Sequence, residues 1–91
     1  MIFTLPAGSD PSELCALHPE AIYYDLADYI RYKAGRSTEA LEAESHESYL
    51  LIEEEALRDL VVMAEITGIP RIVRLCPDTL DNPECARLVR L

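Results

Sequence analysis

The longest run of helical hydrophobic periodicity extends over residues 48–67, with the sequence SYLLIEEEALRDLVVMAEIT. Its apolar residues recur every three or four positions and form two adjacent stripes, which together make a face wider than about 100°. A face of this width needs packing partners on more than one side. Gly68 readily adopts a positive φ and Pro70 cannot continue a helix, so both mark its end. We predict a central helix over this range.

Residues 60–63 and 71–75 are both rich in β-branched side chains and flank the turn 67–70, which is also compatible with a β-hairpin. The helix is favoured because the run from Ser48 is too long for one strand and its polar positions recur at three to four. Residues 71–76 are then either a strand or a short helix. Residues 1–5 are short and β-prone, so a two-stranded element of 1–5 with 71–75 stays open.

Other helices are predicted by start and stop residues. Asp10 and Pro11 begin a brief helix that ends near Leu17, and Asn82-Pro83 begins the last one. In that last helix Cys85, Leu88, Val89 and Leu91 are predicted to face inward.

Between these lies a second helix over 19–34, which begins with Pro19 and ends before Gly35. A third segment is capped by Ser37 or Thr38 and breaks near 45–48, where serines favour caps and turns. We therefore expect a mainly α fold: one compact domain over residues 1–91 with four to five helices.

Charge is concentrated in one third of the chain. Seventeen acidic residues against eight basic ones give a net charge of −9, and residues 37–66 hold nine of the acids and one base. Such a charge repels phosphate backbones and attracts basic protein surfaces. We therefore expect a protein partner with a basic surface and no direct binding to nucleic acid.

The three cysteines are an odd number, which favours a reducing compartment. No signal peptide is evident at the start, and no stretch approaches 18 consecutive apolar residues. These features predict a cytoplasmic protein that does not interact with a membrane.

A zinc site would use Cys15 and His18 together with Cys76 and Cys85. Only the first pair has the close spacing that zinc ligands usually show. Free cysteines are common in cores, so we expect core residues, no metal and no cofactor.

Acid–base catalysis would use Asp25, Asp28 and His46, because two acids three residues apart on a helix perturb each other. No nucleophile–base pattern and no glycine-rich phosphate loop accompanies them. We expect that the protein is not an enzyme.

Residues 63–71, MAEITGIPR, resemble the first helix and turn of bacterial helix-turn-helix regulators. The resemblance implies a regulator in which 60–76 bind DNA and Arg71 and Arg74 open the recognition helix. Arg74 stands where the pattern has an apolar residue, Pro77 shortens the second helix, and the net charge opposes phosphate binding.

The acidic third predicts a surface that docks on a basic groove of a partner by electrostatic steering. Tyrosines are suited to anchor such an interface. The predicted partner-binding residues are Glu39, Glu42, Glu44, Glu47, Glu53, Glu54, Glu55, Asp59, Tyr23, Tyr24 and Tyr32, with Tyr49 as a further aromatic anchor.

In size and charge the chain resembles the small acidic inhibitors that phages and mobile elements direct at host nucleic-acid machinery, including anti-CRISPR proteins. The resemblance implies a non-enzymatic inhibitor or modulator. Two alternatives are a helix-turn-helix transcriptional regulator and a homo-oligomer that packs the wide apolar face of the central helix against its copy.

Overall fold

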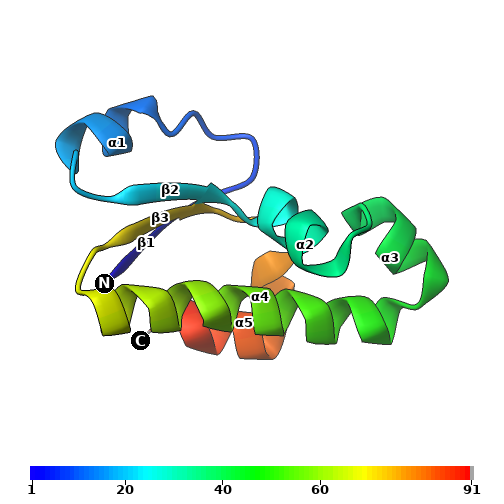
Figure 1. The fold of residues 1–91 in the computed structure, drawn as a ribbon. Helices are drawn as coiled ribbons and strands as arrows, with labels where there is room; N and C mark the ends of the chain where they lie inside the picture. Colours follow the sequence, from blue (N-terminus) through cyan, green and yellow to red (C-terminus); the bar gives the residue numbers. More distant parts are fainter. Residues whose placement is uncertain (91) are drawn as a thin grey trace.

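The computed structural model describes residues 1–90, in which three strands are interspersed among five α-helices (Figure 1). The predicted mainly α single domain is confirmed. The predicted position of Leu91 lies outside the described residues. In chain order the elements are β1 (Ile2–Leu5), α1 (Ser12–Leu17), β2 (Ile22–Asp25), α2 (Leu26–Ala34), α3 (Thr38–Glu44), α4 (His46–Thr67), β3 (Arg71–Arg74), the 3-10 helix η1 (Thr79–Asp81) and α5 (Pro83–Val89).

The sheet has the order β1-β3-β2, and both outer strands run parallel to β3. The pairing of residues 1–5 with 71–75, which the sequence leaves open, is present between Ile2–Leu5 and Arg71–Arg74, and a third strand adds to it. Ile72 and Val73 of β3 have no exposed surface. Strands that are covered on both faces have such continuous apolar sequences.

The prediction of one helix over 19–34 is wrong in its first part, because Ile22–Asp25 form β2. Ile22, Tyr23 and Tyr24 are β-branched or aromatic, and such side chains fit a pleated surface. The helix begins only after Asp25, whose Oδ1 accepts a hydrogen bond from the amide of Ala27 at 3.0 Å. Pairing with β3 therefore overrides the helical start signal at Pro19.

The connections between the strands place helices on both faces of the sheet. The chain crosses from β1 to β2 past the position of β3, and it returns from β2 to β3 through α2, α3 and α4. Crossovers between parallel strands are right-handed. Because the crossover from β1 to β2 and the one from β2 to β3 run in opposite directions across the sheet, their helices lie on opposite faces. Figure 1 shows α1 above the sheet and α4 below it.

Helix α4 is the central element, and the hairpin alternative is excluded. It begins after Ser45, whose Oγ accepts the Ser48 amide at 3.3 Å, and it ends at Gly68 with φ of 72°. It packs against β1, β3, α2, α3 and α5. The predicted break between the third segment and the central helix is confirmed at Ser45.

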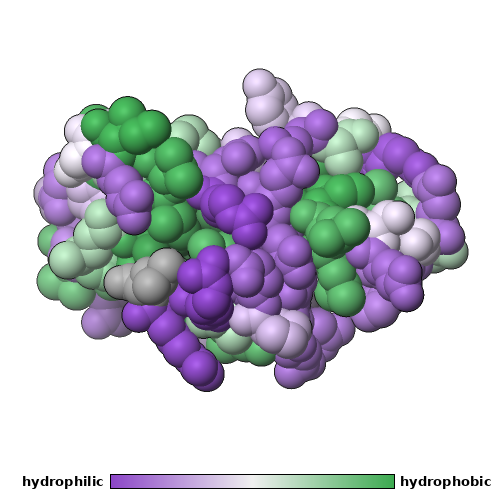
Figure 2. Space-filling model, turned by 90° about the horizontal axis from the view of Figure 1, so that it is seen from below, coloured by the Kyte–Doolittle hydropathy of each residue, from purple (hydrophilic) through white to green (hydrophobic). Residues whose placement is uncertain are grey.

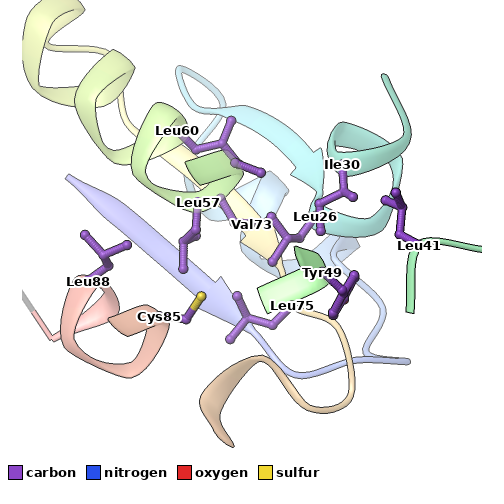
Figure 3. Close-up of a cluster of buried hydrophobic side chains, with 11 residues drawn as sticks. Leu26, Ile30, Leu41, Tyr49, Leu57, Leu60, Val73, Leu75, Cys85 and Leu88 are labelled. Atoms are coloured by element: carbon purple, nitrogen blue, oxygen red, sulfur yellow. The ribbon is translucent and has the colours of Figure 1, made fainter. Parts of the chain in front are cut away.

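The core is one cluster of side chains from α2, α3, α4, α5 and the segment around β3 (Figure 3). Leu57 and Leu60 of α4 are fully buried, as are Leu26 and Ile30 of α2. In α5, Cys85 and Leu88 are buried as predicted, and Val89 is half-buried. Asn82 caps α5 by accepting the Glu84 amide at 3.3 Å.

The helix-turn-helix prediction for 60–76 is wrong, because Arg71 and Arg74 lie in the central strand of the sheet and not in a second helix. The Arg71 side chain is buried and donates to the carbonyl of Ile69 at 2.5 Å, just beyond the end of α4. A cation at this place stabilises the carbonyl-rich end of a helix. Arg71, to which the helix-turn-helix resemblance assigns DNA binding, therefore stabilises the fold.

Within residues 1–90, no helix is both long enough and apolar enough to cross a membrane.

Candidate functional site

The acids predicted to form one face divide into groups with different surroundings. Lys33 of α2 pairs with Glu55 and Asp59 of α4, with Nζ to oxygen distances of 3.2 and 2.8 Å. Arg36 pairs with Glu44. Lys33 thus joins α2 to α4, and the two bases together offset two of the three acidic charges.

Glu53, one of the predicted partner-binding acids, is almost entirely buried, with only 1% of its surface exposed. Its carboxylate accepts hydrogen bonds from Tyr49 Oη at 3.3 Å, Thr79 Oγ1 at 3.0 Å and Asn82 Nδ2 at 3.3 Å. Burial raises the pKa of Glu53, and these hydrogen bonds oppose that rise. Glu53 therefore links α4 to η1 and α5, and both of its carboxylate oxygens accept hydrogen bonds from within the protein.

The carboxyl ends of the three parallel strands meet at one edge of the sheet, which is where open α/β sheets form crevices. A hollow of about 610 Å³ lies there. It is lined by Ala7 and Gly8 after β1, Asp25 at the end of β2, and the segment 74–78 that ends and follows β3. Residues of α3 close its other side.

A second hollow of about 360 Å³ adjoins the first one, because Glu42, Tyr49 and Asp78 line both. We call the two hollows together the acidic cleft. Its exposed acids are Glu39 and Glu42 from α3 and Asp78 and Asp81 from the segment after β3. Within residues 1–90, His46 is the only ion-pair partner of any of the four, at 2.5 Å from Glu42.

The floor of the acidic cleft is held by a charged pair. Arg74 donates to Asp25 Oδ2 from Nε at 2.8 Å and from its terminal nitrogen at 2.5 Å, and it also donates to the carbonyl of Ser9 at 3.1 Å. These contacts raise the pKa of Arg74, with the hydrogen bond to Asp25 as the main cause. Because Asp25 also caps α2, the pair ties β2, β3 and α2 together beneath the cleft.

Asp78 and Asp81 are missing from the sequence-based site. They lie in a separate turn, about forty residues from Glu39. Of the other predicted acids, Glu47 is exposed and Glu54 is half-buried, and neither lines the cleft. The sequence holds no signal that the turn after β3 returns to α3, because this depends on the sheet topology.

The predicted tyrosine anchors also differ in exposure. Tyr49 is buried and lines both hollows of the acidic cleft, whereas Tyr32 is 83% exposed. Tyr23 and Tyr24 are half-buried. A hollow of about 620 Å³, which we call the tyrosine pocket, is lined by Tyr23, Tyr24, Asp25, Asp28, Tyr29, Tyr32 and Met63.

The thiols of Cys76 and Cys85 do not have the properties of reactive groups. Cys76 lines the acidic cleft, and burial raises its pKa to about 11. Burial also raises the pKa of Cys85, to about 12. Both thiols are therefore protonated near neutral pH, where the thiolate would be the nucleophile.

The residues considered for a metal or for catalysis form no common site within residues 1–90. The ring of His18 stacks on Phe3 with 4.3 Å between centroids. Nowhere in residues 1–90 do three or more His, Cys, Asp or Glu side chains form a group that could hold a metal ion. His46 has no hydrogen bond or ion pair with Asp25 or Asp28 in that part of the chain.

No protein-family model, curated protein or solved structure matches this chain. The fold defines a small, mainly helical domain on a three-stranded parallel sheet, with an acidic cleft at the carboxyl end of that sheet.

Proposed function

We propose that the protein is a non-enzymatic binding module whose acidic cleft receives a basic segment of a protein partner. The observation that carries this proposal is the gathering of four exposed acids from two distant segments around one concave surface. A concave surface can surround lysine or arginine side chains, which a solvated helix face cannot do.

The charge balance supports a basic partner. Five of the eight basic side chains form ion pairs with acids within residues 1–90, namely Lys33, Arg36, Arg58, Arg74 and Arg87. Arg71 is buried at the end of α4. The protein therefore has few bases left to neutralise the cleft, and the net charge of −9 steers cationic surfaces toward it.

Proteins that handle nucleic acids carry clusters of lysine and arginine, since these residues contact phosphates. We propose a partner of this class, on which the bound protein occupies a phosphate-binding surface and so inhibits or modulates it. Direct binding of nucleic acid is not part of this proposal, because the cleft repels phosphate.

The cleft can be tested with an arginine-rich peptide labelled for fluorescence anisotropy. The test variant carries Glu39→Gln, Glu42→Gln, Asp78→Asn and Asp81→Asn. The matched control carries Glu13→Gln, Glu20→Gln, Glu54→Gln and Glu65→Gln, which lie outside the cleft. Each variant neutralises four acids and changes the net charge from −9 to −5, so the two differ only in where charge is lost.

We expect the cleft variant to bind the peptide about tenfold more weakly than the wild type, and the control to bind within about threefold of it. We expect the affinity of the wild type to fall as salt is added. Equal weakening of both variants would mean that the peptide responds to net charge alone, and this would contradict a binding role for the cleft.

A further inference from the structure

The tyrosine pocket is built mainly from β2 and α2, and it shares one lining residue with the acidic cleft. Asp25 lines both hollows. Strand β2 is an outer strand of the sheet, and Tyr23 and Tyr24 lie within it. Helix α2 supplies Tyr29 and Tyr32, and α4 supplies Met63.

Three of the rings form one continuous aromatic wall. Tyr24 and Tyr29 are nearly perpendicular, at 85° with 5.7 Å between centroids, and Tyr32 continues from Tyr29 at 6.1 Å. Tyr29 is held in place because its hydroxyl donates to Asp59 Oδ2 at 3.2 Å. The faces of such rings carry partial negative charge and attract cations within about 6 Å.

The charges around this wall also favour a cation. Asp28 lines the pocket, is exposed and has no ion pair within residues 1–90. Asp25 contributes a second carboxylate, which Arg74 neutralises. The nearby ammonium of Lys33 is not the cation of this pocket, because it is paired with Glu55 and Asp59.

Tyr32 is not explained by packing. A tyrosine ring that is 83% exposed contributes little to the core, but it provides a large rigid surface for a ligand. Met63 adds a polarizable thioether to the same surface. The wall is thus apolar and aromatic, with one free carboxylate at its side.

We propose that the tyrosine pocket binds an organic ammonium group whose charge is spread over methyl groups. A plain lysine ammonium is strongly hydrated and needs several acceptors, whereas a methylated one loses little hydration against aromatic faces. The ligand is a free quaternary amine or the side chain of a methylated lysine. This site is separate from the acidic cleft and does not depend on the function proposed for it.

The direct probe is choline, compared with its neutral isostere 3,3-dimethylbutan-1-ol, in which a carbon replaces the charged nitrogen. Both are titrated into the full chain while the tyrosine ring resonances are followed by NMR. We expect choline to shift the rings of Tyr24, Tyr29 and Tyr32 and to bind about fivefold or more tightly than the isostere. Equal binding of both compounds, or no shift with choline, would overturn the proposal.

Variants at exposed positions test the role of the wall without disturbing the core. We expect Tyr32→Leu to weaken choline binding about fivefold, and Tyr32→Phe, which keeps the aromatic face, to bind like the wild type. Asp28→Asn should weaken binding about twofold to threefold. If Tyr32→Leu and Tyr32→Phe bind choline equally well, the aromatic face plays no part and the proposal fails.

A third experiment distinguishes a free amine from a methylated lysine as the source of the ammonium group. It compares a short peptide that carries trimethyllysine with the same peptide carrying unmodified lysine. Tighter binding of the trimethyllysine peptide than of choline identifies a methylated side chain, with the free edge of β2 available to the peptide main chain. Tighter binding of choline identifies a free amine. Preference for unmodified lysine would contradict the proposed chemistry.

Discussion

Glu53 is the residue whose surroundings say most about how this fold is held. A carboxylate that is 1% exposed is stable only where donors satisfy its oxygens, and Tyr49, Thr79 and Asn82 supply them. The same network fixes the segment after β3, which carries Asp78 and Asp81. The acidic cleft therefore depends on a buried acid that does not itself bind anything outside the protein.

Replacement of Glu53 by leucine is expected to destabilise the fold by about 2–4 kcal/mol, because hydroxyl and amide donors are left unpaired in the interior. Glu53→Gln is the matched control, since its amide can donate to the hydroxyls of Tyr49 and Thr79 and accept from Asn82. Urea unfolding at neutral pH measures both. A leucine variant as stable as the glutamine variant would show that the network does not stabilise the fold.

The protonation of Glu53 is expected to make the free energy of unfolding depend on pH. Its pKa in the folded state is raised above the ordinary value of 4.5, so the folded state holds the proton more tightly than the unfolded state does. The stability that protonated Glu53 contributes is complete below about pH 4.5 and is lost as the pH rises through the raised pKa. Relative to the wild type, Glu53→Gln should therefore gain stability as the pH rises from 4.5 to neutral.

Unfolding free energies of the wild type and Glu53→Gln, measured at several values of pH in that range, test this directly. The difference between the two proteins isolates Glu53 from all other titrating groups. A difference that stays constant with pH would mean that burial does not shift the pKa of this carboxyl.

At the scale of single elements, the junction of β2 and α2 depends on Asp25. Its Oδ1 caps α2 while its Oδ2 accepts from Arg74, so one side chain ends the strand, begins the helix and ties β2 to β3. We expect Asp25→Ala to cost about 2–3 kcal/mol, because both the cap and the charged pair are lost. Asp25→Asn keeps a capping oxygen and should cost roughly half as much.

Thermal or urea unfolding of the two Asp25 variants separates these contributions. If Asp25→Asn is as destabilising as Asp25→Ala, the cap contributes nothing and the junction depends on the charged pair alone.

The end of α4 depends on the backbone conformation of Gly68. Its φ is 72°, and an added Cβ would meet no atom within 4 Å, so the cost of a side chain here is conformational only. We expect Gly68→Ala to lower the unfolding free energy by about 1–2 kcal/mol. Gly35→Ala at the end of α2, with φ of 74°, is the matched comparison and should cost a similar amount. No loss of stability in either variant would contradict this.

The sequence predicts the starts and ends of helices well where a local signal sets them. The break near residues 45–48, Asn82 as a cap, and Gly35 and Gly68 as helix ends need only the residues around them. Strand β2 is missed because Pro19 is a strong local helix start, while the partner that makes 22–25 a strand lies about fifty residues away in β3. Pairing over that distance leaves no local pattern.

At the scale of the whole molecule, the topology assembles the acidic cleft. Three parallel strands end at one edge, and there α3 faces the turn after β3. The sequence predicts the acidic third of the chain, and Glu39 and Glu42 lie in the cleft. It could not predict that Lys33 pairs with Glu55 and Asp59 and that Arg36 pairs with Glu44, because this depends on how α2 docks.

The homo-oligomer in which the apolar face of the central helix packs against its copy stays a prediction. Most of the apolar face of α4 is covered within the monomer, including Ala56, Leu57 and Leu60. Leu51, Val62 and Ile66 remain exposed. The face below α4 and α5 shows hydrophobic areas separated by a hydrophilic band (Figure 2). The exposed apolar surface is thus smaller than the sequence predicts for this helix.

An NMR titration of the isotope-labelled protein with an arginine-rich peptide, at low and at high salt, tests directly whether the acidic cleft binds a basic partner. We expect amide shifts to concentrate at Glu39, Glu42, Asp78 and Asp81, and to weaken as salt is added. Shifts spread evenly over all exposed acids, with Glu13, Glu47 and Glu65 moving as much as the cleft, would contradict a specific site for a basic partner.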